Sequence, residues 1–354
     1  NVALFETVPG FPADENLARA GDLLGIVIAR YRLFWRAVRW ADVVHYAFGR
    51  SILGPNIYPS LDRLPLSRPW AWPRRLYSRL TWFADLPLLN RMGKTLVVTW
   101  QGDDARQGDR SRELFDISIA GEIRDDSYYN STSDAWKRRI IARFTRYAAR
   151  QYALNPDLLH MLPAGTRFLP YASIDPFALT SRPPDPAGIA PLRFAHAPSH
   201  RRAKGTRYIL EAVDRLRAEG LEFSFALIEG EHRADALKRL SEADVVLDQL
   251  LAGWYGGLGL EAMSLGKVLL AYIRPGDLKF VPAEFARDLP VVSVTPTTVA
   301  EVMRSLIAMP RSELHAAGQR SRMFAERYHA PHVIAEATVA DYRNLTAPMQ
   351  KTAA

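Results

Sequence analysis

Short runs of apolar residues alternate along this chain with longer segments in which apolar residues recur at helical spacing. In the second half, the short runs are residues 192–196, 223–228, 245–247, 268–272 and 291–294. Residues 41–48 and 96–99 have the same character in the first half. Such alternation predicts strands joined by helices, and therefore an α/β protein with parallel sheets.

A proline-rich segment, residues 176–191, separates the two halves, and so many prolines exclude regular structure. We expect it to be a linker between an N-terminal Rossmann-like domain, residues 1–175, and a second one, residues 192–330. A chain of 354 residues is long enough for both. A second proline-rich stretch, residues 55–75, is expected to be irregular.

Composition narrows the class of protein. Hydrophobic residues make up 48% and charged residues 24%, as in soluble globular proteins, and no apolar run approaches the roughly 20 residues of a spanning helix. The absence of cysteine excludes disulfides and thiolate chemistry. We therefore expect a cytoplasmic protein without a signal peptide.

The net charge of +8 lies mostly in the first half, where residues 1–175 hold 24 Lys and Arg against 18 Asp and Glu. Tryptophans and arginines are interleaved there, which is typical of proteins that contact a membrane interface. These residues are Trp70, Trp72, Trp82, Arg68, Arg74, Arg75 and Arg79. We expect peripheral contact with an anionic surface; the alternative is a solvated basic face over a loop whose tryptophans pack on their own domain.

A glycine-rich loop, residues 253–257, stands between a strand and a short helical pattern that Gly266 ends. Gly256 and Gly257 allow the backbone to approach a ligand, and the N-terminus of the helix suits a phosphate. Glu261, in the first turn or so, could accept hydrogen bonds from hydroxyls of the same ligand. The alternative is that the glycines allow tight packing and that Glu261 favours the helix dipole.

A second loop concentrates positive charge between a strand end and a helix start. Ser199, Arg201, Arg202 and Lys204 place one hydroxyl and three cations there, a set that suits a diphosphate. Taken alone, such a loop is more often a surface feature.

A third loop, residues 101–104, follows a strand of the first half, at the sheet edge where ligands gather. Its aspartates could contact an acceptor or cap the next helix.

The segment Glu261-Ala-Met-Ser-Leu-Gly resembles the donor-site signature of retaining glycosyltransferases with the GT-B fold, in particular glycosyltransferase family four. Lys204-Gly205 matches the family's Lys-Gly, while the family's Arg could be either Arg201 or Arg202. Two departures stand out. Gly253 replaces the first glutamate of the signature, and Gln101 replaces a histidine.

The resemblance implies two Rossmann-like domains facing each other across a cleft, with residues 331–354 as a helix that crosses back to the N-terminal domain and a tail. It implies a hexosyltransferase-like enzyme that moves a sugar from a nucleotide diphosphate sugar to a hydroxyl acceptor, with retention and without a metal or cofactor. Cell-envelope polysaccharide biosynthesis is the implied setting. The implied donor-binding residues are Ser199, Arg201, Arg202, Lys204, Tyr255, Gly256, Gly257, Leu258 and Glu261. Gln101 and Asp104 are the candidates near the sugar or acceptor.

The sequence lacks the motifs of several other classes of protein. The sequence contains no Asp-x-Asp, which argues against a metal-dependent glycosyltransferase, and no nucleic-acid-binding motif. Two alternatives to the transferase stay open, namely a nucleotide-sugar epimerase on the same fold and a non-catalytic nucleotide-binding module. The donor base and sugar, the acceptor, the linkage and the oligomeric state are not predicted.

Overall fold

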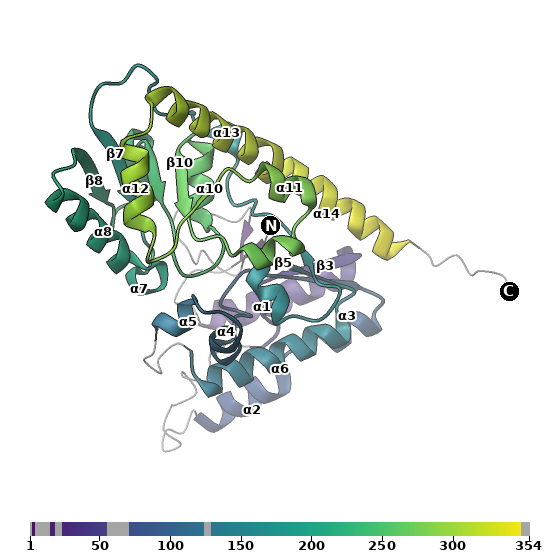
Figure 1. Cartoon of the computed structure of the whole chain (residues 1–354). Helices are drawn as coiled ribbons and strands as arrows, with labels where there is room; N and C mark the ends of the chain where they lie inside the picture. The colour runs from purple at the N-terminus through teal and green to yellow at the C-terminus, as the bar shows by residue number, and fades with distance from the viewer. Residues whose placement is uncertain (1, 4–14, 18–22, 55–70, 124–128, 348–354) are drawn as a thin grey trace.

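The structure is a computed structural model that describes residues 2–3, 15–17, 23–54, 71–123 and 129–347. Within these residues the chain forms two larger parallel sheets, one in each half (Figure 1). A short additional pair joins β1 (Val2–Ala3) to β2 (Glu15–Asn16). The α/β class and the parallel sheets expected from the sequence are confirmed.

The N-terminal sheet has four strands in the order β3-β4-β5-β6. They are β3 (Val43–Ala47), β4 (Thr95–Trp100), β5 (Arg150–Ala153) and β6 (Arg167–Phe168). Because β4 lies inside the sheet and is covered on both faces, its sequence is a nearly unbroken apolar run rather than an alternating one. The helices of this half are α1 (Leu23–Trp40), α2 (Ala71–Thr81), α3 (Asp85–Arg91), α4 (Gly108–Leu114), α5 (Ile119–Glu122) and α6 (Ser131–Tyr147), with a 3₁₀ turn, η2 (Pro156–His160).

The start of α2 corrects one expectation. Residues 71–75, predicted to be irregular, form the beginning of this helix. Pro73 is compatible with that place, because an N–H in the first helical turn has no carbonyl partner to lose. Residues 55–70, which include Trp70 and Arg68, lie outside the described residues.

The C-terminal sheet has the strand order β11-β10-β9-β7-β8. Its strands are β7 (Leu192–His196), β8 (Phe223–Leu227), β9 (Val245–Leu247), β10 (Val268–Ala271) and β11 (Val292–Ser293). The helices are α7 (Arg201–Lys204), α8 (Thr206–Ala218), α9 (Arg233–Glu242), α10 (Gly257–Ser264), α11 (Ala283–Asp288), α12 (Val299–Ile307) and α13 (Arg311–His329), with 3₁₀ turns η3 (Pro176–Ala178) and η4 (Pro275–Phe280). All five strands coincide with the apolar runs of the sequence.

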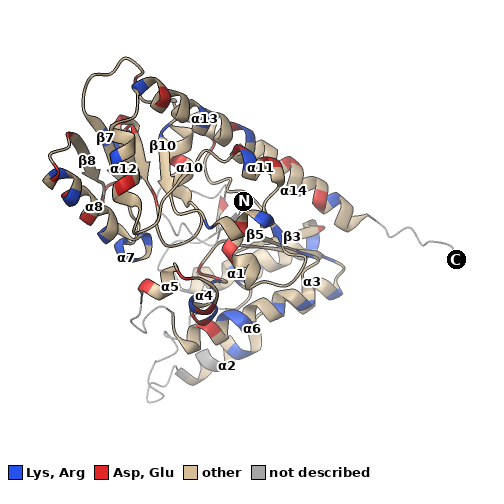
Figure 2. Ribbon diagram, in the orientation of Figure 1, with Lys and Arg blue, Asp and Glu red and all other residues tan. Residues whose placement is uncertain are grey.

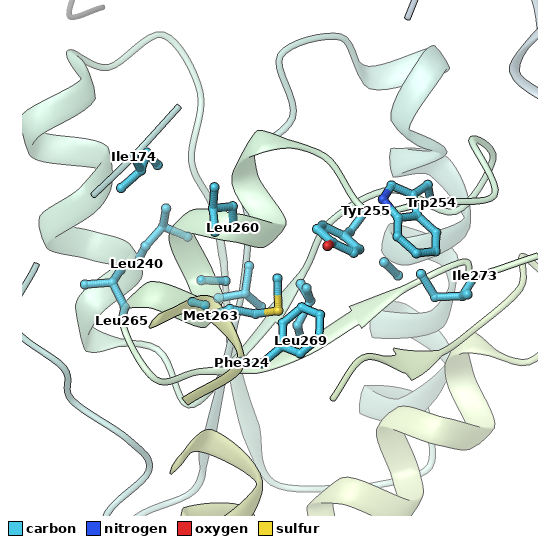
Figure 3. Packing of buried hydrophobic residues seen from close by; sticks show 14 of the residues in the cluster. Ile174, Leu240, Trp254, Tyr255, Leu260, Met263, Leu265, Leu269, Ile273 and Phe324 are labelled. Atoms are coloured by element: carbon cyan, nitrogen blue, oxygen red, sulfur yellow. The ribbon is translucent and has the colours of Figure 1, made fainter. Parts of the chain in front are cut away.

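The core of the C-terminal half fixes the position of α10. Leu260 and Met263 of this helix pack with Leu269 of β10 and Phe324 of α13 (Figure 3). All four side chains are buried. This burial holds the start of α10, and with it the glycine-rich loop, rigidly against the sheet.

The last helix, α14 (Pro331–Thr346), leaves α13 and reaches the N-terminal sheet (Figure 1). The Asp341 carboxylate accepts hydrogen bonds from Arg150 Nε, at 2.8 Å, and from the Tyr152 hydroxyl. The Tyr342 hydroxyl pairs with His45 Nδ1. The expected crossover helix is therefore present, and it ties β3 and β5 to the end of the chain.

Candidate active site between the two domains

A hollow of about 780 Å³ lies between the two halves, at the carboxyl ends of strands from both sheets, where open α/β sheets bind ligands. We call this hollow the cleft. Its N-terminal wall includes Phe48, Gly49, Arg50, Trp82, Phe83, Gln101, Gly102, Asp103, Asp104, Arg106, Trp136, Lys137 and Asn155. Its C-terminal wall is formed by Ser199, His200, Arg202, Ala203, Lys204, Gln249, Ala252, Gly256 and Gly257.

The N-terminus of α10 opens into the cleft. Gly256 precedes the helix in an extended conformation, and its N–H donates to the buried carboxylate of Asp248. A Cβ added at Gly257 would meet no atom within 4 Å, so the space in front of the helix is free. Since no side chain caps this helix, its first N–H groups are directed at that space, an arrangement that suits an anion.

Lys204 lies beside the same helix end. Its Nζ donates to Gln249 Oε1 at 2.6 Å and lies 3.5 Å from Asp248 Oδ1. A Cβ at Gly256 would be 3.0 Å from that Nζ, so the glycine lets the ammonium group approach closely. The structure therefore brings Lys204 and the glycine-rich loop together, although Lys204 and Gly256 are 52 residues apart in the chain.

The two arginines of α7 point in different directions. The Arg202 side chain lines the cleft together with Ser199, and Figure 2 shows the basic residues of α7 close to α5 of the N-terminal domain. Arg201 instead forms a two-pronged ion pair with Glu229, with Nε donating at 2.7 Å, and does not line the cleft. Of the two candidates, Arg202 is the one that faces the space in front of α10.

Glu261 is further along α10 and lies just outside the cleft lining. Its carboxylate accepts a hydrogen bond from Arg233 Nε of α9 at 3.1 Å, and the side chain is 14% exposed. Burial raises the pKa of Glu261, and the Arg233 guanidinium opposes that shift. The carboxylate is thus already paired, and a ribose would have to share it with Arg233.

Tyr255 and Leu258 contribute no side chain to the cleft. The Tyr255 ring is fully buried and stacks on Trp254 (Figure 3). Its hydroxyl pairs with His329 Nε2 at 2.8 Å. Leu258 packs against the same core. The Tyr255 side chain therefore supports the loop from the core, and a donor in the cleft would meet the backbone at these two positions.

On the N-terminal wall, Asp104 holds the loop that follows β4. Its carboxylate accepts from the backbone N–H groups of Gly102 at 2.8 Å, Gln101 at 3.0 Å and Gly49 at 3.3 Å. Burial raises the pKa of Asp104, while these three donors oppose the shift. Asp104 therefore joins the β3 and β4 loops, and the Gln101 side chain is left on the cleft wall. The alternative that Asp104 caps the next helix is wrong, because the N–H groups of Gly108 and Asp109 at the start of α4 donate to Asp134 instead.

Asp103 is engaged in a different network. It accepts from Arg106 Nη1 at 2.8 Å and from the Tyr129 hydroxyl, and Arg106 also donates to Asp157 at 2.7 Å. Arg106 is 7% exposed, so its charge is compensated almost entirely within the protein. This network stiffens the wall.

Three further wall residues were not predicted. Phe48, directly after β3, has a left-handed backbone with φ of 61°, and the Arg50 guanidinium lies 5.1 Å from the centre of its ring. The position of these two at a strand end could have indicated them. Lys137 of α6 is 3% exposed and donates to the Arg106 carbonyl at 2.6 Å; burial lowers its pKa. Nothing in its helical pattern distinguishes it.

Gly253 marks the strongest departure from the resembled signature. It has φ of 77°, and a Cβ there would lie 2.7 Å from Arg274 Nη2. That guanidinium reaches across to the N-terminal domain, where it donates to the Ile117 carbonyl at 3.0 Å and covers the Phe115 ring at 3.7 Å. The space of the missing glutamate is thus taken by an arginine that joins the two domains.

Among solved structures, the chain is similar to sucrose-phosphate synthase from Thermosynechococcus elongatus, with a TM-score of 0.54 and 14% identity over 94% of this chain and 81% of that one. It is also similar to Anabaena HepE in complex with UDP-glucose, with a TM-score of 0.51 and 13% identity over 92% of this chain and 86% of that one. The fold is GT-B. No protein-family model and no curated protein matches the sequence, so the GT-B likeness concerns the architecture alone.

Proposed function

We propose that this GT-B protein is a glycosyltransferase that moves a hexose from a nucleotide diphosphate sugar to a hydroxyl acceptor. One observation carries the proposal: two cations, Lys204 and Arg202, converge with the open N-terminus of α10 inside the cleft. Each of these features stabilises a phosphate, and together they match a diphosphate.

In this proposal, Lys204, Arg202 and Ser199 contact the diphosphate, together with the backbone at Gly256 and Gly257. The ribose lies toward Glu261, whose carboxylate accepts from its hydroxyls alongside Arg233. Gln101 is placed near the transferred sugar. Arg201 is assigned no donor contact, because Glu229 holds it away from the cleft.

The chemistry follows from the charges. The bond between the anomeric carbon and the diphosphate oxygen breaks, and the acceptor oxygen bonds to that carbon. The departing diphosphate gains negative charge, which Lys204 and Arg202 stabilise more strongly than they stabilise the intact donor. We propose transfer with retention, in which the acceptor proton passes to the diphosphate itself. The same two cations supply the charge compensation that a divalent metal gives in other enzymes, so the proposed reaction needs none.

The acceptor side of the cleft combines aromatic rings with the Arg50 cation. An acceptor with a sugar ring or an apolar part fits these walls, whether it is a polysaccharide, a lipid-linked saccharide or a small molecule. Cell-envelope polysaccharide synthesis at the cytoplasmic face of a membrane is the setting that we propose.

The test is a donor-turnover assay with UDP-glucose, the ligand in the structure of HepE, and with other nucleotide sugars. Slow donor hydrolysis without an acceptor, and faster release of nucleotide with one, supports the transferase. Conversion of the donor into its epimer without nucleotide release would indicate the epimerase. Nucleotide binding with neither reaction above background would indicate a non-catalytic module. NMR of the product's anomeric proton tests retention.

A further inference from the structure

Helix α1 has two apolar faces, and only one of them is covered. Ala29, Phe34 and Ala37 are buried against the N-terminal core. A second row of residues follows the helical period on another side and is solvent-exposed. This row consists of Leu24, Val27, Ile28, Tyr31 and Trp35, and the Trp35 side chain is 53% exposed.

Helix α2 continues the exposed surface. Trp72, Leu76 and Leu80 recur every four residues and are all exposed, with Trp72 and Leu80 each at 68%. The two helices approach each other at Tyr77 of α2 and Tyr31 of α1: burial and the nearby Tyr31 hydroxyl raise the pKa of Tyr77 to about 12. We call these two rows the α1–α2 face. Half of the exposed large hydrophobic side chains among the described residues belong to α1 and α2, a concentration that marks an interaction surface.

The charged residues of the two helices themselves are all basic. Neither helix contains an Asp or Glu, whereas α1 carries Arg32, Arg36 and Arg39 beside the exposed row. Arg36 pairs with Glu15, and a shallow hollow on α1 is lined by its exposed row and these arginines. Interleaved aromatic and basic side chains are the composition of helices that lie in a bilayer interface, with rings at the headgroup level and cations at the phosphates.

We propose that the α1–α2 face docks on an anionic phospholipid bilayer, with both helices lying in the interface plane. No helix in the described part of the chain is long and apolar enough to span a membrane. A second copy of the chain fits the face less well, because two such faces would bring the arginines of α1 together and neither helix offers a carboxylate to them.

The face also stands next to the acceptor side of the cleft. Helix α1 leads into β3, which is followed by Phe48 and Arg50 of the cleft wall, and α2 leads directly to Trp82. Docking would therefore place the cleft close to acceptors held in the membrane surface. This last step rests on the proposed glycosyl transfer, whereas the docking itself does not.

The test is co-sedimentation of the full chain with vesicles of phosphatidylcholine alone or mixed with phosphatidylglycerol. We expect binding to the mixed vesicles that weakens as NaCl is raised, and at least tenfold weaker binding to the neutral ones. The variant L24S/I28S/W35S should lower binding to mixed vesicles at least tenfold. The matched control is I189S/M323S, which removes two exposed apolar side chains that lie outside α1 and α2 and should bind like the wild type.

Nucleotide binding of the triple variant is measured alongside, and unchanged affinity shows that it is folded. Failure to bind mixed vesicles, equal binding to both vesicle types, or unaltered binding of the triple variant would overturn the proposal. A wild-type dimer that the triple variant loses, without vesicle binding, would assign the face to a second copy. Normal donor turnover by a wild-type protein that does not bind the mixed vesicles would refute the docking surface and leave the transferase standing.

Discussion

Replacing Lys204 tests the donor site at its most specific contact. In Lys204→Ala the ammonium group beside Gly256 is removed, while the open N-terminus of α10 and Arg202 remain. The charge available to a diphosphate therefore falls without any change in the backbone that surrounds it.

The size of the effect follows from the contact that is lost. A hydrogen bond to a charged group contributes about 1.5–3 kcal/mol. At 1.4 kcal/mol for each factor of ten, the dissociation constant of a nucleoside diphosphate should rise roughly 10- to 150-fold. The variant should also lose about 1–3 kcal/mol of folding stability. The fully buried Asp248 carboxylate keeps the hydrogen bond from the Gly256 N–H, but it no longer has the Lys204 ammonium group beside it.

The assay is isothermal titration with the nucleoside diphosphate that binds the wild type best, at a temperature where both proteins are folded. Arg201→Ala is the matched control. This substitution also removes a cation from α7, but Glu229 holds that cation outside the cleft. The affinity of Arg201→Ala for the nucleoside diphosphate should therefore differ less than twofold from that of the wild type. Equal weakening in both variants would mean that only the overall charge matters, and unchanged affinity in Lys204→Ala would refute the assignment.

Three other changes have defined outcomes. Glu261→Ala should remove most nucleotide affinity but spare binding of inorganic pyrophosphate, because Glu261 is assigned to the ribose; equal loss for both ligands in titrations would contradict that role. Burial lowers the pKa of His329 to about 4. The unfolded state therefore takes up the proton first, and stability should fall by about 3 kcal/mol as the pH drops from about 6.5 to 4. His329→Gln should flatten that fall in urea titrations, and a curve parallel to the wild type would refute the cause. Gly253→Ala should destabilise by about 1–3 kcal/mol, since it strains a left-handed residue and displaces Arg274. Arg274→Ala should relieve part of that cost, so strict additivity in a double-mutant cycle would contradict the contact.

The strands and the loops at their ends could be predicted because each depends on local sequence. Buried parallel strands require short apolar runs, which are visible in the sequence. The cations after β7 and the glycines after β9 meet in the cleft because parallel strands end at one sheet edge. The crossover of α14 came from the resemblance to GT-B proteins. Its contacts, such as Asp341 with Arg150, join residues nearly two hundred positions apart.

Side-chain direction could not be predicted, because it depends on partners distant in the chain. Arg201 and Arg202 are equivalent in the sequence, and only Glu229, on another loop, separates their roles. Tyr255 adjoins Gly256, yet its hydroxyl is held in the core by His329. For the exposed row of α1, the helical spacing of apolar residues is visible in residues 24–35. The sequence still does not show which of the two apolar faces of the helix the rest of the protein covers.

The central claim is that the cleft binds a nucleotide diphosphate donor on protein cations. The most direct measurement is thermal unfolding of the wild type and Lys204→Ala with UDP, GDP, ADP, dTDP and CMP, each with and without EDTA. At a hundred times its dissociation constant a ligand stabilises the folded state by about 2.7 kcal/mol, a shift of a few degrees in the melting temperature. The account predicts that one diphosphate stabilises the wild type equally with EDTA, and Lys204→Ala much less. No stabilisation by any nucleotide, or a shift that EDTA abolishes, would contradict it.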